Sequence, residues 1–214
     1  MYQPNKTLLA SLFGYCFLIK ILPFVLMHFG MDIQSDATYP WTFTPLFAVG
    51  LFGMGLFKDL RMGFLLPVAA CLAADVTIGV LAGMQYGLQE GLAYALYPGQ
   101  VLNYLGLFAA IGVGLIIRRV RNVGTVLVSA ILAPVLFFLI SNFGVWAFDT
   151  YIGYPRTLAG FQQAYFAGLP FLKNSLISTL AYSALLFSPM GIAQLKQNAV
   201  ASRSNVSAVA THKG

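Results

Sequence analysis

The chain has 214 residues, of which 59% are hydrophobic and 8% are charged, and it carries a net charge of +6. A soluble domain carries about 25% charged residues and cannot bury this much apolar surface, so the composition excludes a water-soluble protein and indicates a lipid bilayer as the solvent. The basic residues lie at the ends of apolar segments and form no stripe with interleaved aromatic residues, which excludes nucleic acid as a partner.

Six apolar segments predict membrane-spanning helices, because about 20 apolar residues are needed to cross the hydrocarbon core. We expect these helices at residues 7–30, 41–57, 62–84, 100–117, 123–148 and 171–195. Residues 85–99 are less apolar and predict a short interfacial helix, and residues 149–170 predict a long connection. The predicted fold class is an all-α, polytopic membrane protein. Residues 1–195 would form a single six-helix domain, and residues 196–214 a polar, disordered cytoplasmic tail.

The positions of the basic residues predict the orientation of these helices. With six spans, nine of the 12 Lys and Arg residues fall on one side: Lys6, Lys58, Arg61, Arg118, Arg119, Arg121, Lys196, Arg203 and Lys213. The positive-inside rule makes this side cytoplasmic, so we expect both termini inside. The predicted location is the plasma membrane, which is the inner membrane in bacteria.

Three charged residues, Lys20, Asp75 and Lys173, lie within the apolar segments, where a charged side chain is costly and is often functional. Counting about 1.5 Å per residue, Lys20 and Asp75 fall at similar depths in the outer halves of the first and third spans. Their opposite charges would allow them to pair. Two interpretations remain open, a buried ion pair that holds two helices together and a cavity in which one or both residues contact a ligand.

Further polar and aromatic residues are expected at the same outer level. The candidate ligand-binding residues there are Trp41, Asn142, Trp146, Tyr154, Arg156, Lys173 and Asn174, with Thr42, Thr44 and Asn103 nearby. Arginine binds carboxylate or phosphate through two hydrogen bonds, and aromatic rings stack on planar ligands or mark the membrane interface. The inner halves of the spans hold no charge. The sequence therefore predicts a polar site on the outer side above an apolar base.

Enzyme chemistry is not indicated. The chain lacks the motifs HExxH, GxSxG and GxxxxGK[ST], and it has no pair of carboxylates on one helix face. Cys16 and Cys71 lie in apolar runs without a CxxC partner, which is typical of small buried hydrophobic residues. We expect no catalytic residues, no cofactor and no metal site.

Small residues recur in several spans and allow helix backbones to approach closely. Ala10 and Gly14 form such a pair in the first span. The second span contains Gly50, Gly53 and Gly55, and the fourth contains Gly106, Ala110 and Gly114. Packing within the bundle and docking of a partner membrane protein both remain open.

Several strings resemble an uncharacterised family of small, mainly bacterial integral membrane proteins. They are Ser-Asn-Phe-Gly-Val-Trp at residues 141–146, Tyr-Pro-Arg-Thr at residues 154–157, Gly-Leu-Pro-Phe at residues 168–171 with Asn174, and Phe-Thr-Pro at residues 43–45. That family is in turn similar to the substrate-binding S components of energy-coupling factor transporters.

The resemblance implies a six-helix bundle that captures a vitamin-like molecule with its outer loops and helix ends. It also implies association with a membrane scaffold protein that carries two ATPase subunits, with Ala10 and Gly14 at the contact. The chain begins Met1-Tyr2-Gln3-Pro4 and lacks the Met-His start of nickel and cobalt members, so an organic cargo is expected. The predicted function is a transporter subunit without its own ATPase that binds a small anionic or zwitterionic solute. The alternative is a structural or assembly protein that acts through helix packing.

Overall fold

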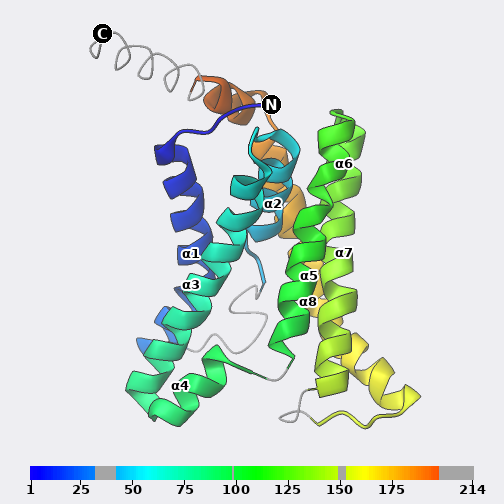
Figure 1. Ribbon diagram of the computed structural model, residues 1–214. Helices are drawn as coiled ribbons and strands as arrows, with labels where there is room; N and C mark the ends of the chain where they lie inside the picture. Colours follow the sequence, from blue (N-terminus) through cyan, green and yellow to red (C-terminus); the bar gives the residue numbers. More distant parts are fainter. Residues whose placement is uncertain (32–41, 98, 149–152, 198–214) are drawn as a thin grey trace.

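The computed structural model describes residues 1–31, 42–97, 99–148 and 153–197, and these residues are almost entirely helical (Figure 1). In chain order the helices are α1 (Lys6–His28), α2 (Leu46–Leu56), α3 (Leu60–Tyr86), α4 (Leu88–Ala95), α5 (Gln100–Gly112), α6 (Gly114–Arg119), α7 (Val123–Phe148) and α8 (Leu158–Leu186). A further helix, Pro189–Gln197, follows α8 at an angle of 56°.

The described residues confirm the predicted all-helical class, and several helices are long and apolar enough to cross a membrane, which is compatible with a multi-pass membrane protein. Four segments of the described chain meet this criterion: α1, α3, α7 and the stretch Leu88–Arg119 that contains α4, α5 and α6. The bent pair of α8 and Pro189–Gln197 gives a fifth. The bounds of α1, α3 and α7 lie within two residues of the predicted spans, and α4 is the predicted short helix.

The helices differ from the predicted segments at several points. The helix in the second segment has 11 residues, or about 17 Å, against the roughly 30 Å of a hydrocarbon core. The fourth segment is interrupted at Val113, between α5 and α6. Residues 158–170 were expected in a connection but belong to α8, which begins where the Thr157 hydroxyl accepts a hydrogen bond from the Gly160 amide. This N-cap, and not the polarity of the residues that follow it, sets the start of α8.

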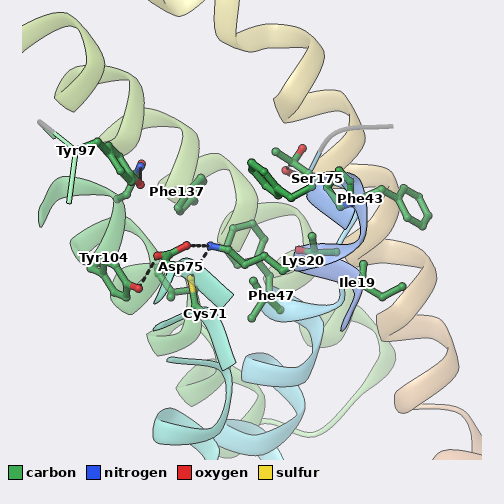
Figure 2. A pocket seen from close by; sticks show the side chains of 17 residues that line it. Ile19, Lys20, Phe43, Phe47, Cys71, Asp75, Tyr97, Tyr104, Phe137 and Ser175 are labelled. Carbon is green, nitrogen blue, oxygen red and sulfur yellow. Dashed lines mark hydrogen bonds and ion pairs between the residues drawn. The ribbon is translucent and has the colours of Figure 1, made fainter. Parts of the chain in front are cut away.

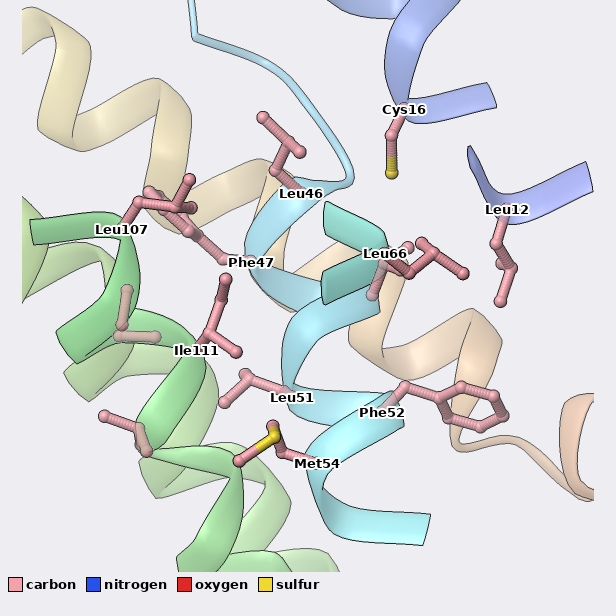
Figure 3. Packing of buried hydrophobic residues seen from close by; sticks show 14 of the residues in the cluster. Leu12, Cys16, Leu46, Phe47, Leu51, Phe52, Met54, Leu66, Leu107 and Ile111 are labelled. Carbon is pink, nitrogen blue, oxygen red and sulfur yellow. The ribbon is translucent and has the colours of Figure 1, made fainter. Parts of the chain in front are cut away.

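The short helix α2 lies at the centre of the protein. All of its residues are buried, and it contacts α3, α5, α6, α7 and α8. Figure 3 shows Phe47, Leu51 and Met54 of α2 beside Leu107 and Ile111 of α5. The hydrophobic core is therefore built around this one helix.

Glycines allow the neighbouring helices to approach α2 closely. A Cβ atom on Gly53 would lie 2.6 Å from the Cα of Gly63 in α3, and one on Gly50 would lie 2.7 Å from the side chain of Ile111 in α5. A Cβ atom on Gly55 would lie 2.9 Å from Ile117 in α6. The glycines of the second segment thus pack within the bundle.

Seven of the basic residues that the structure describes gather at one end of the bundle: Lys6, Lys58, Arg61, Arg118, Arg119, Arg121 and Lys196. The chain begins there, α2 and α6 end there, α3 and α7 begin there, and the helix Pro189–Gln197 lies there too (Figure 1). Arg118 has a structural role at this end, because its guanidinium donates to the carbonyl oxygens of Phe57 at 2.7 Å and of Met54 and Lys58 at 3.4 Å. These bonds satisfy carbonyls that the C-terminus of α2 leaves without helical partners.

We predict that Gly53→Ala lowers the stability of the protein by about 1–3 kcal/mol, because the added methyl group meets backbone atoms of α3 that have no room to shift. The matched control is Gly14→Ala on α1, where a Cβ atom meets nothing within 4 Å. That control should leave stability unchanged or raise it by up to about 1 kcal/mol. Unfolding midpoints of the detergent-solubilised variants check this, and equal midpoints for the two would contradict the packing of α2.

Candidate functional site

A cavity of about 290 Å³ lies beyond the N-terminal end of α2, in the half of the bundle that faces away from the basic end (Figures 1 and 2). It is bounded by α1, α3, α5, α7 and α8, and Leu46 and Phe47 of α2 line it from the centre of the protein. The lining residues are Ile19, Lys20, Pro23, Phe24, Thr42, Phe43, Thr44, Leu46, Phe47, Cys71, Asp75, Tyr97, Asn103, Tyr104, Leu107, Phe137 and Ser175.

An ion pair between α1 and α3 forms the polar part of the wall. The Lys20 ammonium lies 2.5 Å from Oδ1 of Asp75, and the two side chains are 23% and 11% exposed. Oδ2 of Asp75 accepts a hydrogen bond from the Tyr104 hydroxyl at 2.7 Å, and Lys20 also donates to Sγ of Cys71 at 3.2 Å. Figure 2 shows these four side chains converging from α1, α3 and α5. The pairing suggested by the depths of Lys20 and Asp75 is confirmed.

The charges of Lys20 and Asp75 cancel, yet the Lys20 ammonium still has an N–H group available for a ligand. Both oxygens of Asp75 have partners, whereas an ammonium carries three N–H donors and the contacts with Asp75 and Cys71 use two of them. Among the described residues, Lys20 therefore keeps one donor at the cavity wall. In a site of low dielectric a positioned donor of this kind binds an acceptor more strongly than it would in water.

Most of the remaining wall is aromatic. Six rings line the cavity, from Phe24, Phe43, Phe47, Tyr97, Tyr104 and Phe137. Polar atoms interrupt them at Thr42, Ser175 and Asn103, where the Asn103 amide donates to the Tyr97 hydroxyl. The arrangement suits a planar apolar group with a polar edge, since rings stack on planar groups and scattered polar atoms fix orientation.

Thr42 holds a strained backbone at the cavity wall. Its φ angle is 65°, a left-handed value that a β-branched residue rarely adopts. Its hydroxyl donates to the carbonyl of Phe171 at 2.9 Å and lies 3.1 Å from the hydroxyl of Ser175, so two contacts with α8 fix it. Strain of this kind is retained where the surroundings enforce it, and it is frequent at ligand sites.

A second cleft, of about 490 Å³, adjoins the cavity between α3, α4 and α5. Asp75 and Tyr104 line both spaces, so their hydrogen bond lies between them. The cleft walls include the exposed apolar residues Leu72, Val76 and Val101. Of the residues described, only the side chains of Asp75 and Tyr104 are thus shared between the cavity and this second cleft, which has exposed apolar residues in its wall.

The other predicted ligand-binding residues that the structure describes are not among the cavity-lining residues. Asn174 is buried on α8 next to Ser175, Lys173 is exposed, and Trp41 lies outside the described residues. Ala10 is exposed, and a Cβ atom on Gly14 would meet open space, so this stripe of α1 is free of packing contacts within the described chain.

Four more of the predicted residues lie on the last turns of α7 or in the segment that leads from α7 to α8. The Asn142 amide donates to the carbonyl of Phe138 at 2.9 Å, and its oxygen lies against Gly168. The Trp146 indole donates to the carbonyl of Pro155 at 3.0 Å, and Arg156 donates to the carbonyl of Tyr154 at 3.1 Å. The contacts of Asn142 with Gly168 and of Trp146 with Pro155 hold the outer end of α7 against α8 and the segment before it, and none of the four residues lines the cavity.

A sequence profile that describes a family of unknown function, DUF6580, matches residues 2–202. The chain belongs to this family. No curated protein and no solved structure matches it. Membership of DUF6580 agrees with the resemblance to an uncharacterised family, and the likeness to S components stays a hypothesis.

The sequence contained signals for some cavity residues of this DUF6580 protein that were not used. Cys71 precedes Asp75 by four residues and therefore lies on the same helix face. Tyr104 follows Asn103, already placed at the outer level, and brings a hydroxyl to that depth. For Tyr97 and Ser175 we find no comparable signal.

We predict that Lys20→Met in this DUF6580 protein destabilises the fold by about 3 kcal/mol, because it leaves the buried Asp75 carboxylate without its counter-ion. The double variant Lys20→Met/Asp75→Asn should regain most of that loss, since a neutral amide still accepts the hydrogen bond from Tyr104. Unfolding in mixed detergent–SDS micelles measures both. Additive losses in the double variant would show that the two side chains do not interact.

Proposed function

We propose that this protein binds a small organic solute in the cavity beside Lys20 and Asp75, and that it serves as the substrate-binding subunit of a membrane transporter. The observation that carries the proposal is an aromatic cavity of about 290 Å³ that contains a buried ion pair with one remaining donor. Its volume is close to the lower end of small-molecule sites, about 300 Å³, which favours a ligand of one or two rings.

The charge of the lining favours a neutral or zwitterionic solute. Asp75 balances Lys20, and neither Arg156 nor Lys173 is among the lining residues. A free anion would therefore meet one cation already paired with a carboxylate. A molecule that carries an acceptor for Lys20 and a planar apolar part matches the wall better.

Six crossings with both termini in the cytoplasm are part of the proposal. α1 ends at the end of the bundle away from the basic residues, and α3 begins at the basic end (Figure 1). The chain between them, which includes α2, therefore crosses back through the protein. The segment that contains α2 then supplies the second crossing, and the bent pair of α8 and Pro189–Gln197 supplies the sixth. The basic end faces the cytoplasm by the positive-inside rule, and the cavity lies toward the outer side.

Two features support a transporter subunit over a receptor that works alone. α2 closes the cavity on its inner side with a fully buried apolar helix, so passage of the solute needs a movement of helices. The sequence has no ATP-binding motif, so the energy for that movement would come from a partner. The open stripe of α1 at Ala10 and Gly14 is the surface we assign to a scaffold protein.

The proposed orientation predicts the labelling of single cysteines in intact bacterial cells. In a Cys16→Ala/Cys71→Ala background, a membrane-impermeant maleimide should label Arg156→Cys in intact cells. It should label Lys196→Cys only after permeabilisation, because the helix Pro189–Gln197 lies at the basic end. The reverse pattern would place the cavity on the cytoplasmic side.

The solute-binding proposal is tested by native mass spectrometry of protein purified in mild detergent. We expect an organic molecule to copurify with the wild type and its retention to fall at least tenfold in Lys20→Met/Asp75→Asn, because this variant removes the ammonium that donates a charged hydrogen bond to the solute. Arg156→Gln is the matched control, since Arg156 lies at the same outer end but outside the lining. Equal retention by both variants would contradict binding in this cavity.

The second candidate is an assembly protein that acts through helix packing. It is favoured by the closed geometry of the Lys20–Asp75 pair and by the open stripe of α1. On this alternative Gly14→Leu abolishes function while Lys20→Met/Asp75→Asn keeps it, and the solute-binding proposal expects the double variant to lose it.

A further inference from the structure

A third cleft, of about 560 Å³, lies at the basic end, far from the Lys20–Asp75 cavity. It is formed where the N-terminal segment, the ends of α2 and α6, the start of α7 and the bend after α8 meet. Its walls are largely apolar, with Val123 and Val126 on α7 facing Phe187 and Ile192 around the bend. The cleft therefore combines a largely apolar wall with a position at the basic end of the bundle, which the proposed orientation places at the cytoplasmic membrane surface.

The edge of this cleft is basic. Arg121 is one of its lining residues, is exposed, and donates to the thioether of Met1 at 3.2 Å, which is a weak acceptor. The neighbouring Arg118 differs, because its guanidinium already donates hydrogen bonds to carbonyl oxygens at the end of α2. Among the described residues, Arg121 thus has no anionic or strong neutral acceptor.

The surroundings reinforce this positive charge. The helix ends and turns at the basic end carry seven cations among the described residues: Lys6, Lys58, Arg61, Arg118, Arg119, Arg121 and Lys196. The one acidic side chain there is Asp59, and it caps α3 through the amide of Arg61. The electrostatic potential at this end of the protein would therefore attract an anionic ligand.

A serine with a buried hydroxyl is among the residues that line the same cleft. Ser183 of α8 is 2% exposed, and its hydroxyl has no hydrogen-bond partner in the described part of the protein. Serine in a helix usually satisfies its hydroxyl with a carbonyl one turn earlier, as Thr179 does with Ser175. An unsatisfied buried hydroxyl is costly, so a ligand that supplies an acceptor inside the cleft would be stabilised.

From these features we infer that the cleft binds an anionic phospholipid, with the phosphate at Arg121, the ester region near Ser183 and the start of an acyl chain between Phe187 and Val126. A phospholipid carries all three groups in this order: a charged phosphate, ester acceptors and a hydrocarbon chain. Basic pockets between membrane helices bind anionic lipid headgroups on the same physical grounds. The inference concerns a different site from the solute cavity and stands without it.

Native mass spectrometry with equal amounts of dioleoyl phosphatidylglycerol and dioleoyl phosphatidylcholine tests this site. We expect the wild type to retain the anionic lipid preferentially and Arg121→Gln to reduce that preference about tenfold, the effect of one charge-assisted hydrogen bond. Arg121→Lys should keep most of the preference. The matched control is Arg119→Gln, two residues away in the same basic cluster but outside the cleft lining, and it should change the preference less than twofold.

Ser183→Ala gives an independent readout, because it removes the buried donor without changing charge. It should weaken binding of both lipids by a similar factor, since both carry the ester groups. Equal effects of Arg119→Gln and Arg121→Gln would reduce the result to general surface charge and overturn the inference. Displacement of the bound lipid by millimolar glycerol 3-phosphate would also overturn it, because it would indicate an anion site without an acyl chain.

Discussion

The close packing of α2 against glycines is the constraint on which the rest of the structure depends. An 11-residue helix cannot reach across a bilayer core of about 30 Å, so it leaves one half of the bundle without a central element. Gly53 against Gly63 lets the backbones of α2 and α3 touch, and Gly50 and Gly55 admit Ile111 and Ile117 from α5 and α6. The helices thus converge tightly at the basic end. Beyond Leu46 they enclose space, and that is where the aromatic cavity lies.

The Lys20–Asp75 pair combines two roles that the sequence presented as alternatives. It joins α1 to α3, and through Tyr104 it also joins α3 to α5, so removing one partner affects packing. The same atoms line a cavity, and the ammonium keeps a donor there. A buried pair costs desolvation energy that its Coulombic attraction offsets only with good geometry and further hydrogen bonds. Tyr104 and Cys71 supply those bonds, which offset the cost of holding the pair at the cavity wall.

Depth along a helix could be predicted from this sequence, but direction around the helix axis could not. Counting residues placed Lys20 and Asp75 at one level, and the bounds of α1, α3 and α7 followed from apolar length alone. Asn142 and Trp146 were placed at the outer level by the same counting, yet they face α8 and its connection. α7 is apolar on all sides, so periodicity gives no facing direction. The shortness of α2 was hidden for the same reason, because a buried helix and a lipid-facing one have the same composition.

The tight seating of α2 also limits how a solute could leave the cavity on the proposed function. Leu46 at one end of α2 lines the cavity, and Leu56 at the other end lines the basic cleft. To open a path between them, α2 would have to slide past Gly63, Ile111 and Ile117, where atoms are already in contact. Helices packed this closely move together as a rigid body, because sliding one past another would force their atoms to overlap. Release would therefore come from tilting the bundle against a partner or from parting α3 and α5 at the Asp75–Tyr104 bond, where few contacts join these helices.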